Sequence, residues 1–122
     1  MADKRRILII MMDGFDPAYL QASDMPNTKH MIANGFFKIV KAIMPTVTNV
    51  NNTGICCGCP PKDHGITANS YYDLTTHKEE YMDQADMVLA PTIFERARKV
   101  GITHSALLTA KRKTQSLLRT GS

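Results

Sequence analysis

Residues 4–16 read KRRILIIMMDGFD, and this stretch decides the expected fold class. Its apolar run, Ile7–Met12, lies between basic residues and the pair Asp13-Gly14. A short continuous apolar run bounded in this way is typical of a strand buried in a parallel sheet. The run is too short for an export signal, and no small-residue cleavage site follows it. We therefore expect a buried strand and a cytoplasmic protein.

The rest of the chain predicts alternating helices and strands. Pro26 suits the first turn of a helix, and Asn34-Gly35 is expected to close that helix as a left-handed cap. The expected elements are a helical turn at 17–20, a helix at 26–33, a strand at 37–44, a helix within 53–59, a loop at 62–73, an amphipathic helix at 91–101 and a strand at 102–109. This order predicts an α/β fold with a mixed or parallel sheet flanked by helices. A length of 122 residues corresponds to one domain, residues 1–122.

Composition narrows the classes of partner. With 43% apolar and 21% charged residues, the chain is expected to be globular. No apolar run reaches the ~18–20 residues that span a bilayer, so no membrane partner is expected. The net charge is +4, but the basic clusters are at residues 4–6, 96–99 and 111–113, and only the last is dense, with no aromatic residues interleaved. We therefore expect no nucleic-acid partner, and a basic cluster that faces a small anion fits better.

Three cysteines lie close together, at Cys56, Cys57 and Cys59. An odd, tightly spaced set does not make a disulfide framework. No second CxxC or HxxxH pair completes a zinc ribbon or finger. Small residues packed on a helix are the favoured interpretation.

Polar residues follow the expected strands at three points: Asp13, the Thr46/Thr48 turn, and the pair Lys111 and Lys113. Because the carboxyl ends of parallel strands meet at one edge, these groups are expected to converge. A carboxylate, a hydroxyl and two ammonium groups there indicate metal-assisted attack on phosphorus. Each group also has an ordinary interpretation, as a turn, a helix cap or a solvated surface. Asn52 or Thr53, for example, could cap the following helix.

Five longer stretches together resemble the alkaline phosphatase superfamily. They are LIIMMDGFDPAYL, MPNTKHMIANG, MPTVTNVNNTGICCGCPPKDHGITANSYYD, APTIFERARKVG and LLTAKRK. Within the superfamily the chain is similar to the type I phosphodiesterase/nucleotide pyrophosphatase branch, and most of all to phosphonoacetate hydrolase. The resemblance implies an alkaline-phosphatase-like fold, of which this chain would form the N-terminal portion, with the sheet incomplete.

The resemblance also implies roles for individual residues. Asp13 matches a metal-binding aspartate, and Thr48 matches a metal-bound nucleophile, whereas Thr46 is a turn residue. Asn69 matches an asparagine that donates to a phosphoryl oxygen. Lys111 and Lys113 match a lysine pair that holds the carboxylate and phosphonate of phosphonoacetate. Two zinc ions are implied as cofactors.

The expected activity is therefore cleavage of the carbon–phosphorus bond of phosphonoacetate, or of another small anionic phosphonate or phosphoester. None of the chain's histidines sits in a matching position, so the other metal ligands are expected outside this chain. One alternative is a phosphodiesterase or nucleotide pyrophosphatase of the same superfamily. Another is a non-catalytic fragment that binds an anion or a partner. A homodimer is left open.

Overall fold

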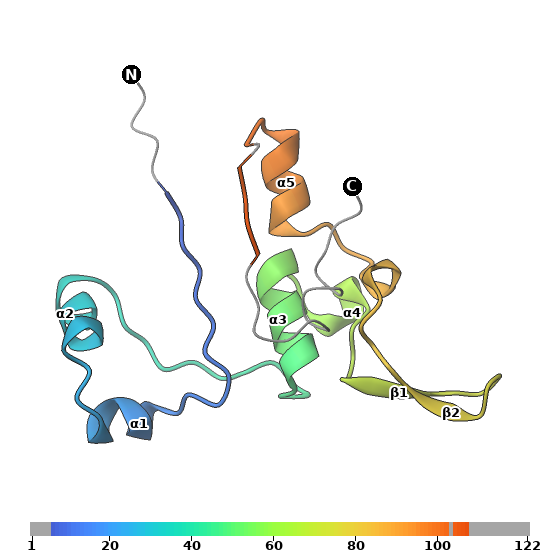
Figure 1. Cartoon of the computed structure of the whole chain (residues 1–122), viewed down its shortest axis with the longest axis horizontal. Helices are drawn as coiled ribbons and strands as arrows, with labels where there is room; N and C mark the ends of the chain where they lie inside the picture. Colours follow the sequence, from blue (N-terminus) through green and yellow to red (C-terminus); the bar gives the residue numbers. More distant parts are fainter. Residues whose placement is uncertain (1–5, 103, 108–122) are drawn as a thin grey trace. The chain divides into compact units, whose positions relative to one another are not determined.

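The structure, a computed structural model, describes residues 6–102 and 104–107 (Figure 1). The chain divides into two compact units, residues 1–41 and 42–122. The prediction of one domain over residues 1–122 stays a prediction. Among the described residues, no helix is both long and apolar enough to cross a membrane.

The first unit contributes two short helices. Helix α1, Pro17–Ala22, begins after Asp16, whose side chain accepts a hydrogen bond from the Ala18 N–H at 2.7 Å. Helix α2, Pro26–Asn34, has proline in its first turn, as predicted. The expected strand Ile7–Met12 is wrong in this structure, since these residues join no sheet and their apolar side chains are exposed. A strand needs neighbouring strands for its backbone hydrogen bonds, and the described part of this unit provides helices only.

The end of helix α2 differs from its prediction. Gly35 has φ −132°, so the expected left-handed cap is wrong. The Asn34 side chain donates instead to the His30 carbonyl at 2.9 Å and so satisfies one of the free carbonyls of the last turn. Glycine is still required, because a Cβ at position 35 would lie 2.8 Å from the Met31 carbonyl oxygen.

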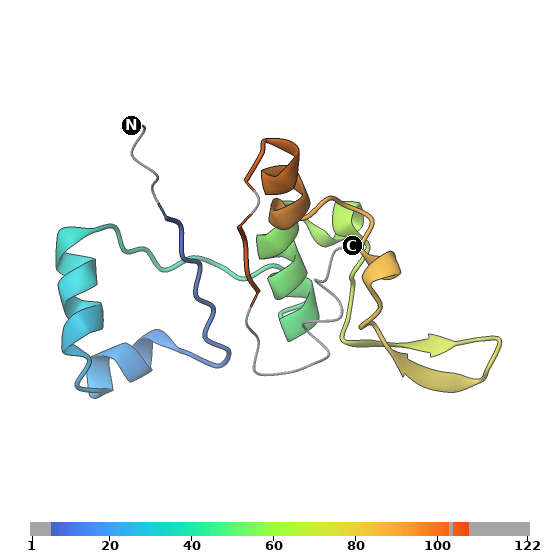
Figure 2. The same cartoon turned by 45° about the horizontal axis from the view of Figure 1, so that its top comes forward.

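The second unit is built around helix α3, Thr48–Cys57. Helix α4, Pro61–His64, and helix α5, Ile93–Lys99, both contact α3, as Figures 1 and 2 show. Val50 from α3 and Ile66 from the segment after α4 pack together as the buried apolar cluster, and Cys57 of α3 is buried as well. The partly buried residues around this pair are Val47, Met82, Met87 and Val88. The 3₁₀ helix η1, Ala85–Met87, belongs to the segment that covers this core.

Helix α3 begins earlier than predicted, because Asn51 organises the chain before it. The Asn51 Nδ2 donates to the carbonyls of Ile43, Pro45 and Val47, and its Oδ1 accepts from the Ile43 N–H at 3.2 Å. The helix therefore starts at Thr48, with Val47 as its N-cap. The prediction that Asn52 or Thr53 caps the helix is wrong, since both lie within it.

The sheet is smaller than predicted. The one sheet among the described residues pairs β1, Ser70–Asp73, with β2, Lys78–Tyr81, in antiparallel register. No mixed or parallel sheet forms there, and residues 37–44, 102 and 104–107 are not strands. The predicted loop at 62–73 is also partly wrong, because it contains most of α4 and all of β1. Short-range hydrogen bonds favour the hairpin: the Asp73 Oδ1 accepts from the Thr75 N–H at 2.7 Å.

Helix α5 lies within the predicted range 91–101, with Thr92 as its N-cap and Val100 as its C-cap. Thr92 and Glu95 form a reciprocal capping box at its start. At its end Gly101 adopts φ +83°, and the Ile102 N–H donates to the Ala97 carbonyl at 2.9 Å. The Arg96 Nη2 donates to the Cys57 carbonyl at 3.5 Å, which links α5 to the last turn of α3.

Alanine substitutions at two glycines that flank α4, Gly58 and Gly65, would test how tightly this helix packs. Gly58 and Gly65 both have positive φ, but only at Gly65 would a Cβ meet other atoms, at 2.9 Å from the Met87 carbonyl oxygen and the Leu89 side chain. We expect Gly58→Ala to lower the free energy of unfolding by about 1 kcal/mol through backbone strain. Gly65→Ala should lower it by about 2 kcal/mol, because overpacking adds to the same strain. Urea denaturation of both variants measures the difference, and equal losses would contradict tight packing around Gly65.

Candidate active site

The predicted nucleophile, Thr48, lies close to Asn69, which is predicted to donate a hydrogen bond to a phosphoryl oxygen. Thr48 is the first residue of α3 and is half-buried. Asn69 immediately precedes β1, yet its Oδ1 accepts a hydrogen bond from the Asn49 N–H at 3.0 Å. The side chain of Asn69 therefore contacts the residue next to Thr48, across 20 positions of sequence.

Two more hydrogen bonds fix this arrangement. The Met82 N–H donates to the Asn69 carbonyl at 2.9 Å. The Asn49 side chain, which is buried, donates through Nδ2 to the Met82 carbonyl at 3.0 Å. Asn49 was not among the predicted site residues. The signal that could have found it is its place directly after Thr48, in a helix where asparagine is otherwise a poor choice.

The start of α3 also suits an anion. Val47 provides no side-chain cap, and a helix N-terminus carries a partial positive charge. A hydroxyl on the first residue, with an amide beside it, can interact with a phosphoryl group bound there. Thr46 is exposed and precedes the helix, which agrees with its expected role as a turn residue.

Of the other three predicted site residues, the structure describes only Asp13. Asp13 lies in the first unit, in an exposed turn with Gly14, which has φ +71°. Lys111 and Lys113 lie outside the described residues. The structure thus brings Thr48 and Asn69 together.

Metal-binding side chains do not gather in the part of the chain that the structure describes. There, no group of three or more histidine, cysteine, aspartate or glutamate side chains could hold a metal ion. His64 is fully buried rather than on a loop surface, and its Nδ1 accepts from the Ile66 N–H at 3.2 Å. Burial lowers the pKa of His64, and its Nε2 has no hydrogen-bond partner among the described residues.

The prediction that the cysteines pack on a helix is confirmed for Cys56 and Cys57 but wrong for Cys59, which follows the C-cap of α3. Cys57 is buried, Cys56 and Cys59 are half-buried, and all three thiols are free. The Cys57 Sγ donates to the Ala90 carbonyl at 3.5 Å. Burial, followed by the neighbouring Cys59, raises the pKa of Cys57 to about 11. A thiol with such a pKa is a poor nucleophile at neutral pH.

Comparison with known proteins decides the family. The sequence profile described as type I phosphodiesterase / nucleotide pyrophosphatase matches residues 7–117, which is most of the chain. The chain belongs to this family. Among curated members similar to it, a mouse (Mus musculus) bis(5′-adenosyl)-triphosphatase is 38% identical over 74 residues, 60% of this chain and 16% of that protein. A venom phosphodiesterase from Macrovipera lebetinus is 39% identical over 72 residues, 57% of this chain and 8% of that protein.

Two solved structures of one enzyme are similar to this chain of the type I phosphodiesterase/nucleotide pyrophosphatase family. Phosphonoacetate hydrolase from Sinorhizobium meliloti, in complex with phosphonoacetate, matches with a TM-score of 0.79 and 36% identity. The match covers 87% of this chain and 26% of that enzyme. The same enzyme in complex with phosphonoformate matches with a TM-score of 0.78 and 37% identity. The predicted resemblance and the α/β, alkaline-phosphatase-like fold class are therefore confirmed. The chain spans only about a quarter of that hydrolase and less of the curated relatives.

Proposed function

We propose that the protein carrying this chain is a metal-dependent hydrolase that cleaves the carbon–phosphorus bond of phosphonoacetate. The observation that carries the proposal is the contact between Asn69 and the first turn of α3, next to Thr48. The likeness to phosphonoacetate hydrolase, with phosphonoacetate or phosphonoformate bound in the solved structures, supports this substrate class. A cytoplasmic location belongs to the same proposal.

The proposed reaction has two steps. The Thr48 oxygen attacks phosphorus and loses its proton, while the carbon–phosphorus bond breaks and the carbon keeps the electron pair. The carbon takes up a proton, so acetate leaves and the phosphoryl group stays on Thr48. Water then attacks phosphorus, releases phosphate and restores the Thr48 hydroxyl. Asn69 donates a hydrogen bond to a phosphoryl oxygen as negative charge builds up there.

Two zinc ions are part of the proposal, with Asp13 and Thr48 as ligands. Their oxygen atoms suit zinc, but a catalytic zinc takes about three protein ligands, and the described residues provide no cluster of three. The described residues therefore do not fit a complete two-metal centre by themselves. When bound, zinc would lower the pKa of a coordinated hydroxyl.

A phosphodiesterase or nucleotide pyrophosphatase activity is the second candidate, favoured by the family that the profile matches and by the curated relatives. The two candidates differ in what Lys111 and Lys113 do. Phosphonoacetate offers a carboxylate and a phosphonate to two ammonium groups, whereas a phosphodiester has no carboxylate.

We expect Lys111→Ala and Lys113→Ala each to lower kcat/KM for phosphonoacetate about tenfold to a hundredfold, because a charge-assisted hydrogen bond is lost. Hydrolysis of a p-nitrophenyl phosphodiester should change far less. Arg112→Ala, which removes the charge between the two lysines, is the matched control. Faster hydrolysis of the diester than of phosphonoacetate by the unmodified protein would favour the second candidate.

A further inference from the structure

The hydrogen bonds around Asn69 determine which end of its side-chain amide is available. The backbone N–H of Asn49 can only donate, so the atom facing it at 3.0 Å must be the Asn69 oxygen. The amide nitrogen of Asn69 donates to none of the residues that the structure describes. Toward the described residues, both N–H donors of the Asn69 amide are unused, and N–H donors are the groups that an anion accepts from.

The main chain of Asn69 is held as well. Its carbonyl accepts from the Met82 N–H at 2.9 Å, and the Met82 carbonyl in turn accepts from the Asn49 Nδ2 at 3.0 Å. Asn49 therefore reaches Asn69 along two routes, directly through its backbone N–H and indirectly through its side chain. Because Asn49 is 9% exposed, water competes little for either contact.

We propose that Asn49 is a positioning residue, which fixes the amide of Asn69 so that its nitrogen serves an anion bound at the start of α3. The competing view is that Asn49 only stabilises the junction of α3 with the hairpin. The two views differ in one property, namely whether the Asn69 side chain depends on Asn49. The inference rests on the proposed function only for the identity of the anion.

The direct test uses the unmodified chain labelled with ¹⁵N and ¹³C. A scalar coupling across the hydrogen bond, from the Asn49 amide nitrogen to the Asn69 Cγ, is expected in its NMR spectrum. Protection of the Asn49 N–H from solvent exchange should accompany this coupling. An Asn49 N–H that exchanges like the free amides of exposed loops, without the coupling, would overturn the proposal.

The second test separates positioning from stability. In Asn49→Asp a carboxylate oxygen replaces the Nδ2 donor and faces the Met82 carbonyl, so the side-chain route is broken. We expect the Asn69 side-chain NH₂ signals to shift and the Asn49 N–H to exchange about tenfold faster. Asn52→Asp, the same change in the same helix, should leave both unchanged. A lower melting temperature in Asn49→Asp with unmoved Asn69 signals would show a merely structural role. If that variant does not fold, the coupling in the unmodified chain decides.

Phosphonoacetate separates this inference from the proposed function. Its addition to the unmodified chain should shift the Asn69 NH₂ signals, and Asn49→Asp should lower kcat about tenfold with KM within about twofold. Loss through KM alone would argue against positioning for the chemical step. An intact Asn49–Asn69 coupling without any response to phosphonoacetate would overturn the proposed substrate while it supports the positioning of Asn69.

Discussion

Thr48→Ala is expected to abolish phosphate release from phosphonoacetate, with kcat reduced about a thousandfold or more, because the attacking oxygen is removed. The helix should persist in this variant. Val47 is the N-cap of α3, so position 48 does not have that role, and alanine is the best helix former. Phosphate release is measured in the presence of zinc, with circular dichroism as the check on folding.

The matched control for this experiment is Thr46→Ala. Thr46 lies two positions before Thr48 but is exposed and outside the helix, so its loss should leave turnover close to that of the unmodified protein. Thr48→Ser keeps a hydroxyl and should recover part of the activity. Unchanged turnover in Thr48→Ala would sink the proposal that this threonine is the nucleophile.

Ile66→Ala is expected to lower the free energy of unfolding by about 3 kcal/mol, through lost apolar burial and the cavity left behind. The effect should be large because Val50, Cys57 and Ile66 are the only buried apolar side chains among the described residues, and Ile66 is fully buried against Val50. Urea denaturation followed by circular dichroism measures the loss.

Ile55→Ala is the control for the core variant, since it makes the same change on α3 at a side chain that is 51% exposed. We expect it to cost well under half as much as Ile66→Ala. Comparable losses of unfolding free energy at the two positions would contradict the expectation that buried Ile66 stabilises the core.

Local signals in the sequence predicted the parts of the fold that depend on neighbouring residues. Proline in the first turn of α2, the helix starting near Pro91 and the glycine after α5 are features of this kind. The start of α3 was not predictable in this way, because it depends on Asn51 contacts that reach back to Ile43. Strands 7–12 and 37–44 were predicted from apolar pattern alone, and pattern does not supply the neighbouring strands that a sheet requires.

The residues of the candidate site also differ in whether the sequence alone could predict them. Thr48 and Asn69 could be proposed from the resemblance, and in the structure Asn69 contacts Asn49, the residue next to Thr48. Asn49 could not, because its importance comes from one contact 20 residues away and another 33 residues away. Such contacts become visible only when the hairpin and α3 are placed side by side.

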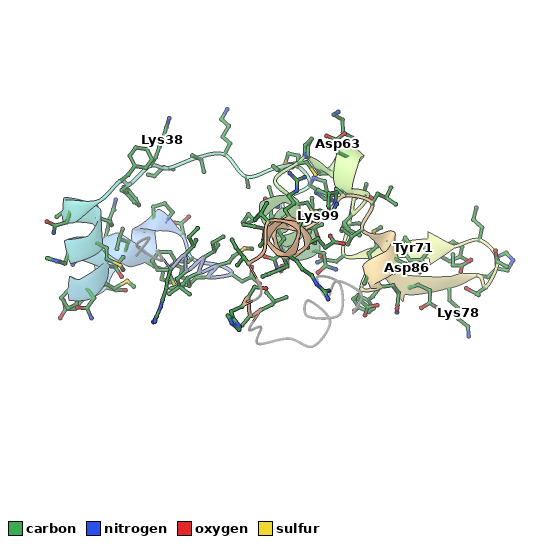
Figure 3. All side chains as sticks on the ribbon, turned by 90° about the horizontal axis from the view of Figure 1, so that it is seen from above. Lys38, Asp63, Tyr71, Lys78, Asp86 and Lys99 are labelled. Carbon is green, nitrogen blue, oxygen red and sulfur yellow. The ribbon has the colours of Figure 1, made fainter. Side chains whose placement is uncertain are left out.

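The buried ring of His64 has a consequence for how the second unit responds to acid. Burial lowers its pKa from the ordinary 6.5 in the folded chain. A backbone hydrogen bond and, to a smaller extent, the charge of the exposed Asp63 of α4 offset this only in part (Figure 3). As the pH falls through about 6.5, the unfolded chain therefore takes up a proton before the folded chain does. Acid thus draws the equilibrium toward the unfolded chain, and the penalty keeps growing until the folded ring is protonated too. His64 makes the junction of α3 and α4 most secure at neutral and alkaline pH.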